Sequence, residues 1–205
     1  MRSNAVHLFV FETMADWEAA YAVAAIHNPQ FQRLPGRYRV VTVGLTGDPV
    51  TTIGGVRIQP DRALNEISPL ASTMLILPGG QSWEFGANAA AIEMARRFIA
   101  QCVPVAAICA ATMALARAGL LDNRYHTSNA RNYLSATGYR GGGFYRERPA
   151  VMDQGVITAS GVAPLEFARE IFEALHLYGA DALEAWYALH KYGDASAYYE
   201  LAQSA

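Results

Sequence analysis

The chain has 205 residues, a formal net charge of −2, 52% hydrophobic residues and 17% charged residues. This length predicts a single domain over residues 1–205, and the composition is typical of a compact α/β protein rather than a disordered chain. The small charge and the lack of a Lys/Arg run argue against binding to nucleic acid or to an anionic membrane.

The two cysteines do not suggest a disulfide framework. They indicate a reducing compartment, and we expect the protein to be cytoplasmic. The apolar stretch near the N-terminus is interrupted by His7 and Glu12, so we expect neither a signal peptide nor a membrane span there. No later stretch approaches the roughly 18 uninterrupted apolar residues of a spanning helix.

In the first half of the chain, apolar runs of strand length alternate with helical patterns. Thr13 is a plausible N-cap for the first helix, and Gly54-Gly55 is expected to form a two-residue hairpin turn. The expected strands cover residues 5–11, 38–45, 50–53, 56–58 and 73–77, and the expected helices cover residues 14–26 and 88–101.

The second half continues the alternation. A strand from Val103 to Ile108 leads directly into a helix that Gly119 closes as a C′ glycine. Short strands are expected over residues 150–152 and 156–159, and helices over residues 132–136, 165–178, 182–191 and 196–205. Residues 180–205 therefore form a C-terminal helical extension.

This alternation predicts a mainly parallel sheet covered on both faces, that is, a flavodoxin-like three-layer α/β/α sandwich. Functional sites in such sheets lie beyond the carboxyl ends of the strands. We expect the segment from Glu12 to Glu18, the turn Pro78-Gly79-Gly80, Cys109 and His126 to meet at that edge.

Cys109 stands where the strand turns into the helix, flanked by Ala107, Ala110 and Ala111. Small neighbours permit the tight turn of a nucleophile elbow, which presents its central side chain above the sheet edge. The helix N-terminus is expected to lower the pKa of the Cys109 thiol. The alternative is a buried structural cysteine, which is common. Cys102 has no helix start beside it, so we expect it to be structural or inert.

Together these motifs resemble the ThiJ/PfpI family of the class I glutamine amidotransferase-like superfamily. The resemblance rests on motifs that span most of residues 5–178, together with an acidic residue after the first strand. These motifs are Leu77-Pro78-Gly79-Gly80, Ala107-Ile108-Cys109-Ala110-Ala111, Ala118-Gly119-Leu120-Leu121-Asp122, and Thr158-Ala159-Ser160-Gly161 ahead of Leu165-Glu166-Phe167-Ala168.

The resemblance implies roles for individual residues. Cys109 would be the nucleophile, and Glu18 would be a protonated carboxylic acid that touches the sulfur and moves protons. Glu12 and Asp16 compete with Glu18 for this role. The amides of Gly79, Gly80 and Ala110 would form an oxyanion hole. His126 would approach the cysteine, with an ordinary partly buried histidine as the alternative.

This chain lacks residues that are typical of some branches of the family, which reduces the number of functions that we expect. Peptidase-like members carry histidine directly after the cysteine, where this chain has Ala110. Amidotransferases proper supply a His-x-Glu pair, and residues 159–164 contain no histidine. The stand-alone stress-protein and glyoxalase-like branch is more similar.

We therefore expect a cysteine-dependent hydrolase or glyoxalase-type enzyme that acts on a small carbonyl or acyl substrate. A non-enzymatic redox or stress sensor oxidised at Cys109 is the alternative. A peptidase or an amidotransferase-like amidohydrolase ranks lower. We expect no cofactor and no metal, because no cluster has zinc spacing. The resemblance further implies a homodimer. The aromatic tail residues, Trp186 to Tyr199, would either contribute to the dimer surface, cover a pocket or pack as ordinary terminal helices.

Overall fold

The computed structural model describes residues 4–203 of the chain. Within this range seven strands form one sheet in the order β5-β2-β1-β6-β7-β9-β8, in which only the edge strand β8 is antiparallel to its neighbour. The strands of this sheet are β1 (Ala5–Phe9), β2 (Arg39–Gly44), β5 (Arg62–Ala63), β6 (Met74–Leu77), β7 (Val105–Ile108), β8 (Ala150–Asp153) and β9 (Val156–Ala159). The predicted mainly parallel sheet is thus confirmed.

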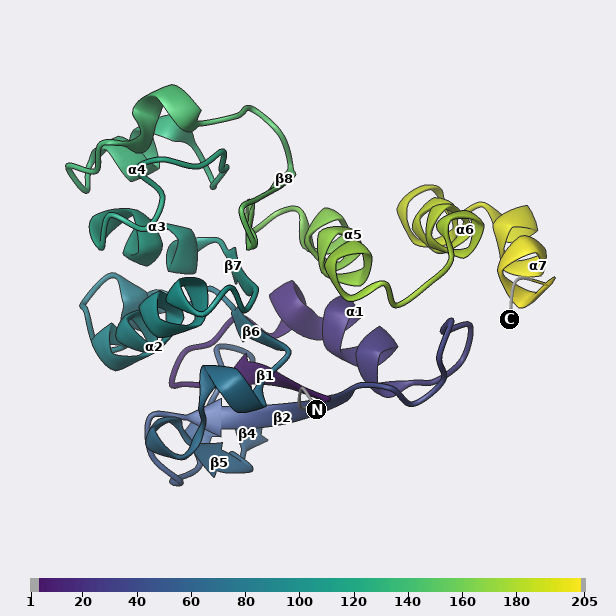
Figure 1. The fold of residues 1–205 in the computed structure, drawn as a ribbon, viewed down its shortest axis with the longest axis horizontal. Helices are drawn as coiled ribbons and strands as arrows, with labels where there is room; N and C mark the ends of the chain where they lie inside the picture. The colour runs from purple at the N-terminus through teal and green to yellow at the C-terminus, as the bar shows by residue number, and fades with distance from the viewer. Residues whose placement is uncertain (1–3, 204–205) are drawn as a thin grey trace.

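Helices cover both faces of the sheet, and Figure 1 shows α1 and α5 on one side and α2 and α3 on the other. The α-helices are α1 (Asp16–His27), α2 (Ala89–Ala100), α3 (Ala110–Arg117), α4 (Arg131–Ser135), α5 (Pro164–Leu175), α6 (Ala180–Tyr192) and α7 (Ala195–Gln203). Because the central strands β6 and β7 are buried at every position, both faces of the sheet contribute to the core. The arrangement is the expected flavodoxin-like sandwich.

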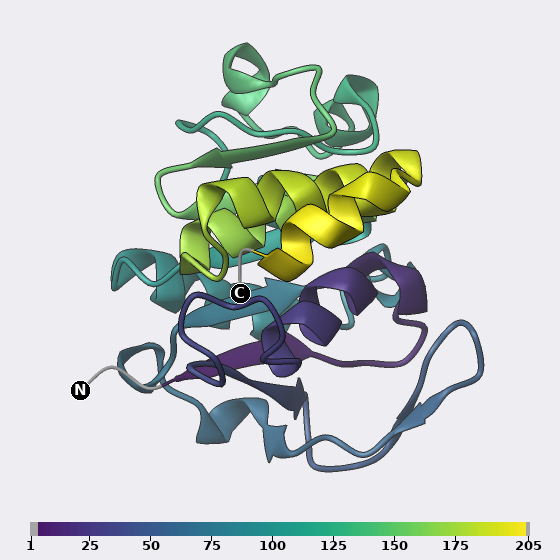
Figure 2. The same ribbon diagram turned by 90° about the vertical axis from the view of Figure 1, so that its right-hand side faces the viewer.

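The C-terminal helices lie outside the central sandwich. Helix α6 packs on α5, and α7 packs on α6. Figure 2 shows this pair of helices at the front of the molecule, with α1 below them. Trp186 of α6 contacts Phe172 of α5, with ring centroids 4.8 Å apart. The predicted last helix extended to residue 205, and residues 204–205 lie outside the described part of the chain, as do residues 1–3. No helix among residues 4–203 has the length and apolar character needed to cross a membrane.

Three local predictions were wrong. Thr13 is not an N-cap, because it adopts a φ of 69° two residues before the cap position at Ala15. Strands β3 (Val50–Thr51) and β4 (Arg57–Ile58) are joined by residues 52–56 rather than by a two-residue turn. Helix α5 ends at Leu175, because His176 adopts the left-handed conformation that commonly terminates helices.

Candidate active site

The corner between β7 and α3 is a strained turn centred on Cys109. Its backbone has φ 58° and ψ −126°, a conformation that non-glycine residues rarely adopt and that often marks functional positions. The Cys109 N–H donates to Ala159 O over 3.0 Å, and Thr112 N–H donates to Cys109 O over 3.0 Å, which ties the corner to β9 and to α3. The half-buried thiol therefore projects above the sheet edge in nucleophile-elbow geometry.

Glu18 of α1 lies against this thiol. Its side chain is 1% exposed and lies beside the Cys109 thiol, because Glu18 Oε1 and Cys109 Sγ would be 3.0 Å and 2.9 Å from a Cβ on Gly161, while its Oε2 atom accepts the Gly79 N–H over 2.5 Å. The competing acids lie elsewhere. Asp16 accepts hydrogen bonds from the Thr52 hydroxyl and the Gly54 N–H, and Glu12 is exposed. Among the three acids, only Glu18 reaches the sulfur.

The expected lowering of the thiol pKa does not match this environment. Burial and the neighbouring charge of Glu18 raise the pKa of Cys109 to about 11, although donors at Asn129 and Ala110 act in the opposite direction. Burial also raises the pKa of Glu18. Two adjacent buried groups resist double ionisation, so the pair retains one shared proton around neutral pH. Burial, together with the charge of Glu18, thus outweighs the effect on the thiol pKa that was expected from the helix N-terminus.

The side chain that contacts the sulfur from the other side is Asn129 rather than His126. Asn129 Nδ2 donates to Cys109 Sγ over 3.3 Å, and its Oδ1 accepts the Gly161 N–H over 2.8 Å. The imidazole of His126 is fully buried, with Nδ1 2.8 Å from Arg124 O and Nε2 3.0 Å from Tyr139 Oη. Its two ring nitrogens are therefore occupied away from Cys109. No sequence motif marks Asn129, which follows His126 by three positions. The sequence therefore did not predict its contact with the Cys109 sulfur.

The backbone amides around the sulfur differ partly from the predicted oxyanion hole. Gly79 N–H is donated to Glu18, so it is not available to a substrate oxygen. Ala110 N–H is directed at the Cys109 sulfur. Gly80 N–H donates no hydrogen bond within residues 4–203. Among the described residues, Gly80 therefore has the unused amide, whereas the Ala110 amide would have to turn from the sulfur to a substrate oxygen.

Two glycines make room for the pair of reactive side chains. A Cβ on Gly79 would lie 2.6 Å from Cys109 Cβ, and a Cβ on Gly161 would lie 2.9 Å from Cys109 Sγ. The carbonyl of Gly161 accepts the indole N–H of Trp17 over 3.3 Å. Trp17 is 52% exposed and forms a rim beside the site, and sequence reasoning had not assigned it a role.

Comparisons with known proteins identify the family. A family model described as the DJ-1/PfpI family matches residues 4–174. A Bacillus subtilis protein described as the uncharacterized protease YoaZ is 38% identical over 204 residues, covering 98% of this chain and 97% of that protein. The crystal structure of a thiJ/pfpI family protein from Bacillus anthracis has a TM-score of 0.93 and 40% identity, covering 100% of this chain and 98% of that one.

A more distant relative, from Caenorhabditis elegans, is described as the glutathione-independent glyoxalase DJR-1.2. It is 28% identical over 143 residues, which cover 68% of this chain and 75% of that protein. The family match over most of the chain, together with the similarity to YoaZ, confirms the resemblance drawn from the motifs. The chain belongs to the DJ-1/PfpI family.

Proposed function

We propose that the protein is a cysteine-dependent enzyme that converts a small carbonyl compound, with Cys109 as nucleophile and Glu18 as the proton carrier. The observation that carries the proposal is the close approach of the buried Glu18 carboxyl group to the half-buried Cys109 thiol, which together flank the Cβ position of Gly161 at 3.0 Å and 2.9 Å. Within residues 4–203 no histidine donates to or accepts from the sulfur, so Glu18 is the titratable group in direct contact with it. Proton transfer therefore depends on the carboxyl group.

A 2-oxoaldehyde fits this arrangement. With the shared proton on Glu18, the Cys109 thiolate adds to the aldehyde carbon, and Glu18 protonates the resulting alkoxide to give a hemithioacetal. The Gly80 and Ala110 amides would stabilise the developing oxyanion. The Glu18 carboxylate then removes the proton from the former aldehyde carbon and returns a proton to the neighbouring carbon, which yields a thioester. Water hydrolyses the thioester, releases a 2-hydroxy acid and restores the thiol.

The descriptions of two relatives point to different reactions, and one of them supports conversion of a 2-oxoaldehyde. The glyoxalase described in Caenorhabditis elegans matches the chemistry above. The protease description of YoaZ points instead to peptide hydrolysis. Peptide cleavage needs a group that protonates the leaving amine, commonly a histidine, yet Ala110 follows the cysteine and His126 is bonded elsewhere. We therefore rank the peptidase and amidohydrolase functions below the carbonyl reaction.

A redox sensor is the second candidate. Peroxide would oxidise the Cys109 thiolate to a sulfenate and then to a sulfinate, with one peroxide reduced to water at each step. The Asn129 and Ala110 N–H groups and a protonated Glu18 would donate to the sulfinate oxygens. These hydrogen-bond donors around the sulfur favour the sensor function. Turnover of a carbonyl substrate would distinguish an enzyme from a sensor.

The test is conversion of methylglyoxal to lactate by the wild-type chain, Cys109→Ala and Cys102→Ser. We expect turnover that survives at Cys102→Ser and disappears at Cys109→Ala. Absence of turnover in all three proteins, together with peroxide oxidation confined to Cys109, would favour the sensor and reject the enzyme. Turnover that persists in Cys109→Ala would reject Cys109 as the nucleophile.

The proposal also includes the cellular compartment, the oligomeric state and the size of the substrate. Both cysteines are free, which suits a reducing compartment such as the cytoplasm. Two further expectations follow from the family, a homodimer and a small-molecule substrate. Sedimentation of the full chain over a range of concentrations tests the first.

A further inference from the structure

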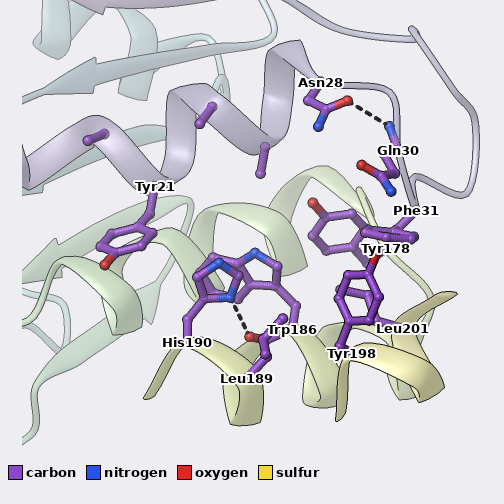
Figure 3. A pocket seen from close by; sticks show the side chains of 13 residues that line it. Tyr21, Asn28, Gln30, Phe31, Tyr178, Trp186, Leu189, His190, Tyr198 and Leu201 are labelled. Atoms are coloured by element: carbon purple, nitrogen blue, oxygen red, sulfur yellow. Dashed lines mark hydrogen bonds between the residues drawn. The ribbon is translucent and has the colours of Figure 1, made fainter. Parts of the chain in front are cut away.

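Helix α1 carries Glu18 in its first turn, so the groups that fix the start of α1 also fix this carboxyl group. Figure 3 shows side chains of α1 and of the C-terminal helices facing one another across a hollow of about 560 Å³, so these helices leave part of α1 uncovered. A contact between them is that of Tyr21 with Trp186, whose ring centroids are 6.2 Å apart. Residues 12–15, by contrast, connect the start of α1 directly to the glycine turn at Gly79-Gly80.

Thr13, in this segment before α1, has a strained backbone. Its φ of 69° lies in the left-handed region, which a β-branched residue rarely adopts. Strain of this kind persists only where neighbouring groups hold the residue in place, and it is concentrated at functional sites. The group that holds the Thr13 side chain is Ser82, shortly after the glycine turn.

Three hydrogen bonds join Ser82 to Glu12 and Thr13. The Ser82 hydroxyl donates to Glu12 O, and because a hydroxyl has a single hydrogen, it is the Thr13 hydroxyl that donates to Ser82 Oγ over 2.9 Å. The Ser82 N–H in turn donates to Thr13 Oγ1 over 3.1 Å. Both hydroxyl groups are thus used to join two loops that lie 69 residues apart in the sequence.

This contact adjoins the Gly80 amide. Met14 and Gly80 form an antiparallel pair, and the Ala15 N–H donates to Gly79 O over 2.9 Å. When the hydrogen bonds of an antiparallel pair run through the flanking residues, the N–H groups of the pair itself point away from each other's chain. The segment before α1 follows β1, and β6 lies between β1 and β7 in the sheet. The Gly80 N–H is therefore directed to the side on which Cys109 follows β7.

We propose that Thr13 and Ser82 are positioning residues, which hold the Gly80 N–H toward the oxyanion that forms at Cys109. Each acts through Gly80 rather than on the substrate itself. Loss of either hydroxyl would let Thr13 relax from its strained conformation and would shift the glycine turn that is paired with the same segment. The inference rests on the proposed function, because it concerns the oxyanion of that reaction.

The kinetic test uses methylglyoxal with Thr13→Val, which keeps the β-branched shape without the hydroxyl, and with Ser82→Ala. We expect kcat to fall roughly tenfold in each, less than the about 100- to 1,000-fold loss that follows removal of an oxyanion donor. KM should stay near the wild-type value, because the amide acts on charge that develops in the transition state. Thr13→Ser retains the hydroxyl and should retain kcat, and the double variant should be no slower than either single one.

Thr46→Val is the matched control. The Thr46 hydroxyl also takes part in two hydrogen bonds, both with Asp48, in the exposed loop between β2 and β3. This variant removes the same chemical group and the same number of bonds from a loop. It should leave kcat, KM and the Gly80 amide unchanged.

The Gly80 amide can be followed directly by NMR. In protein made with glycine labelled at both the nitrogen and the carbonyl carbon, a spectrum filtered through the amide bond between two glycines shows the second residue of each Gly-Gly pair. These residues are Gly55, Gly80, Gly142 and Gly143. After sequential assignment, the Gly80 signal should shift in Thr13→Val and Ser82→Ala but stay in place in Thr13→Ser and Thr46→Val.

Two results would overturn the inference. A Gly80 signal that stays in place in both Thr13→Val and Ser82→Ala would show that these hydroxyl groups do not set the amide. A loss of kcat in Thr13→Val that Thr46→Val matches, or that Thr13→Ser shares, would show a general effect on the fold. Absence of turnover in the wild-type chain would reject the proposed function instead, and the Gly80 signal would still decide whether Thr13 and Ser82 hold this amide.

Discussion

Asn129 donates its side-chain N–H to Cys109 Sγ over 3.3 Å while its Oδ1 accepts the Gly161 N–H. The second bond fixes the amide orientation, so the group facing the sulfur is a donor. That donor lowers the pKa of Cys109 and favours the thiolate. Asn129→Ala should therefore raise the pKa of Cys109 and reduce kcat/KM for methylglyoxal roughly tenfold, the worth of one hydrogen bond to a charged atom.

The matched control for this change is Asn132→Ala, an exposed asparagine in α4. It should leave both the thiol pKa and kcat/KM at their wild-type values. Equal losses in the two variants would show that Asn129 acts through the fold of this segment rather than through the sulfur. The measurements are an NMR titration of isotope-labelled cysteine and steady-state kinetics.

Glu18 exerts the opposite influence. Burial of the thiol and, after it, the charge of Glu18 hold the pKa of Cys109 at about 11. Glu18→Gln removes the charge while keeping the size of the side chain, so the midpoint of Cys109 ionisation should move to lower pH. Turnover should nevertheless fall at least about a hundredfold, because an amide cannot carry protons. The titration uses the Cys102→Ser background, since Cys102 is exposed. An unchanged midpoint would contradict the coupling of the two groups.

Gly161 tests how tightly the site is packed. The methyl group of Gly161→Ala would lie 2.9 Å from Cys109 Sγ and 3.0 Å from Glu18 Oε1, so the two side chains must move apart. We expect alkylation of Cys109 to slow and turnover to be largely lost, with unfolding free energy reduced by about 1–3 kcal/mol. Gly143→Ala, where a Cβ meets no atom within 4 Å, should change none of these quantities.

The fold was predictable because its signals are local and repeated. Apolar runs at β1, β6 and β7 and the small residues around Cys109 specify buried parallel strands and a tight corner. The pairing of Glu18 with Cys109 followed from the family resemblance, and residue patterns alone did not separate it from Asp16. Glu18 and Asp16 are distinguished by Thr52 and Gly54, which lie between β3 and β4 and donate hydrogen bonds to the Asp16 carboxylate.

The electrostatic state of the site could not be predicted in the same way. A helix N-terminus is visible in sequence, whereas the burial of Glu18 and Cys109 against Gly79 and Gly161 depends on four separate segments meeting. The role of Asn129 has the same origin, because Gly161 N–H orients its amide from another loop. Contacts of this kind are set by tertiary packing, not by spacing along the chain.

His7 provides a stability test remote from the active site. It lies in β1, is 5% exposed, and its Nδ1 has no hydrogen-bond partner within residues 4–203. Burial, aided by the charge of Arg39, lowers the pKa of His7 to about 4. The unfolded chain binds a proton at higher pH than the folded chain does, so stability is fully present above about pH 6.5 and falls as the pH drops toward 4. The loss from this residue should be about 3 kcal/mol.

His7→Leu should abolish this part of the pH dependence. Chemical denaturation at neutral and acidic pH measures it as the difference in unfolding free energy between the two conditions. His27→Leu replaces an exposed histidine at the end of α1 and should retain the wild-type acid sensitivity. If His7→Leu lost as much stability on acidification as wild type, the buried imidazole would not be the source, and the carboxyl groups of the chain would have to account for the effect.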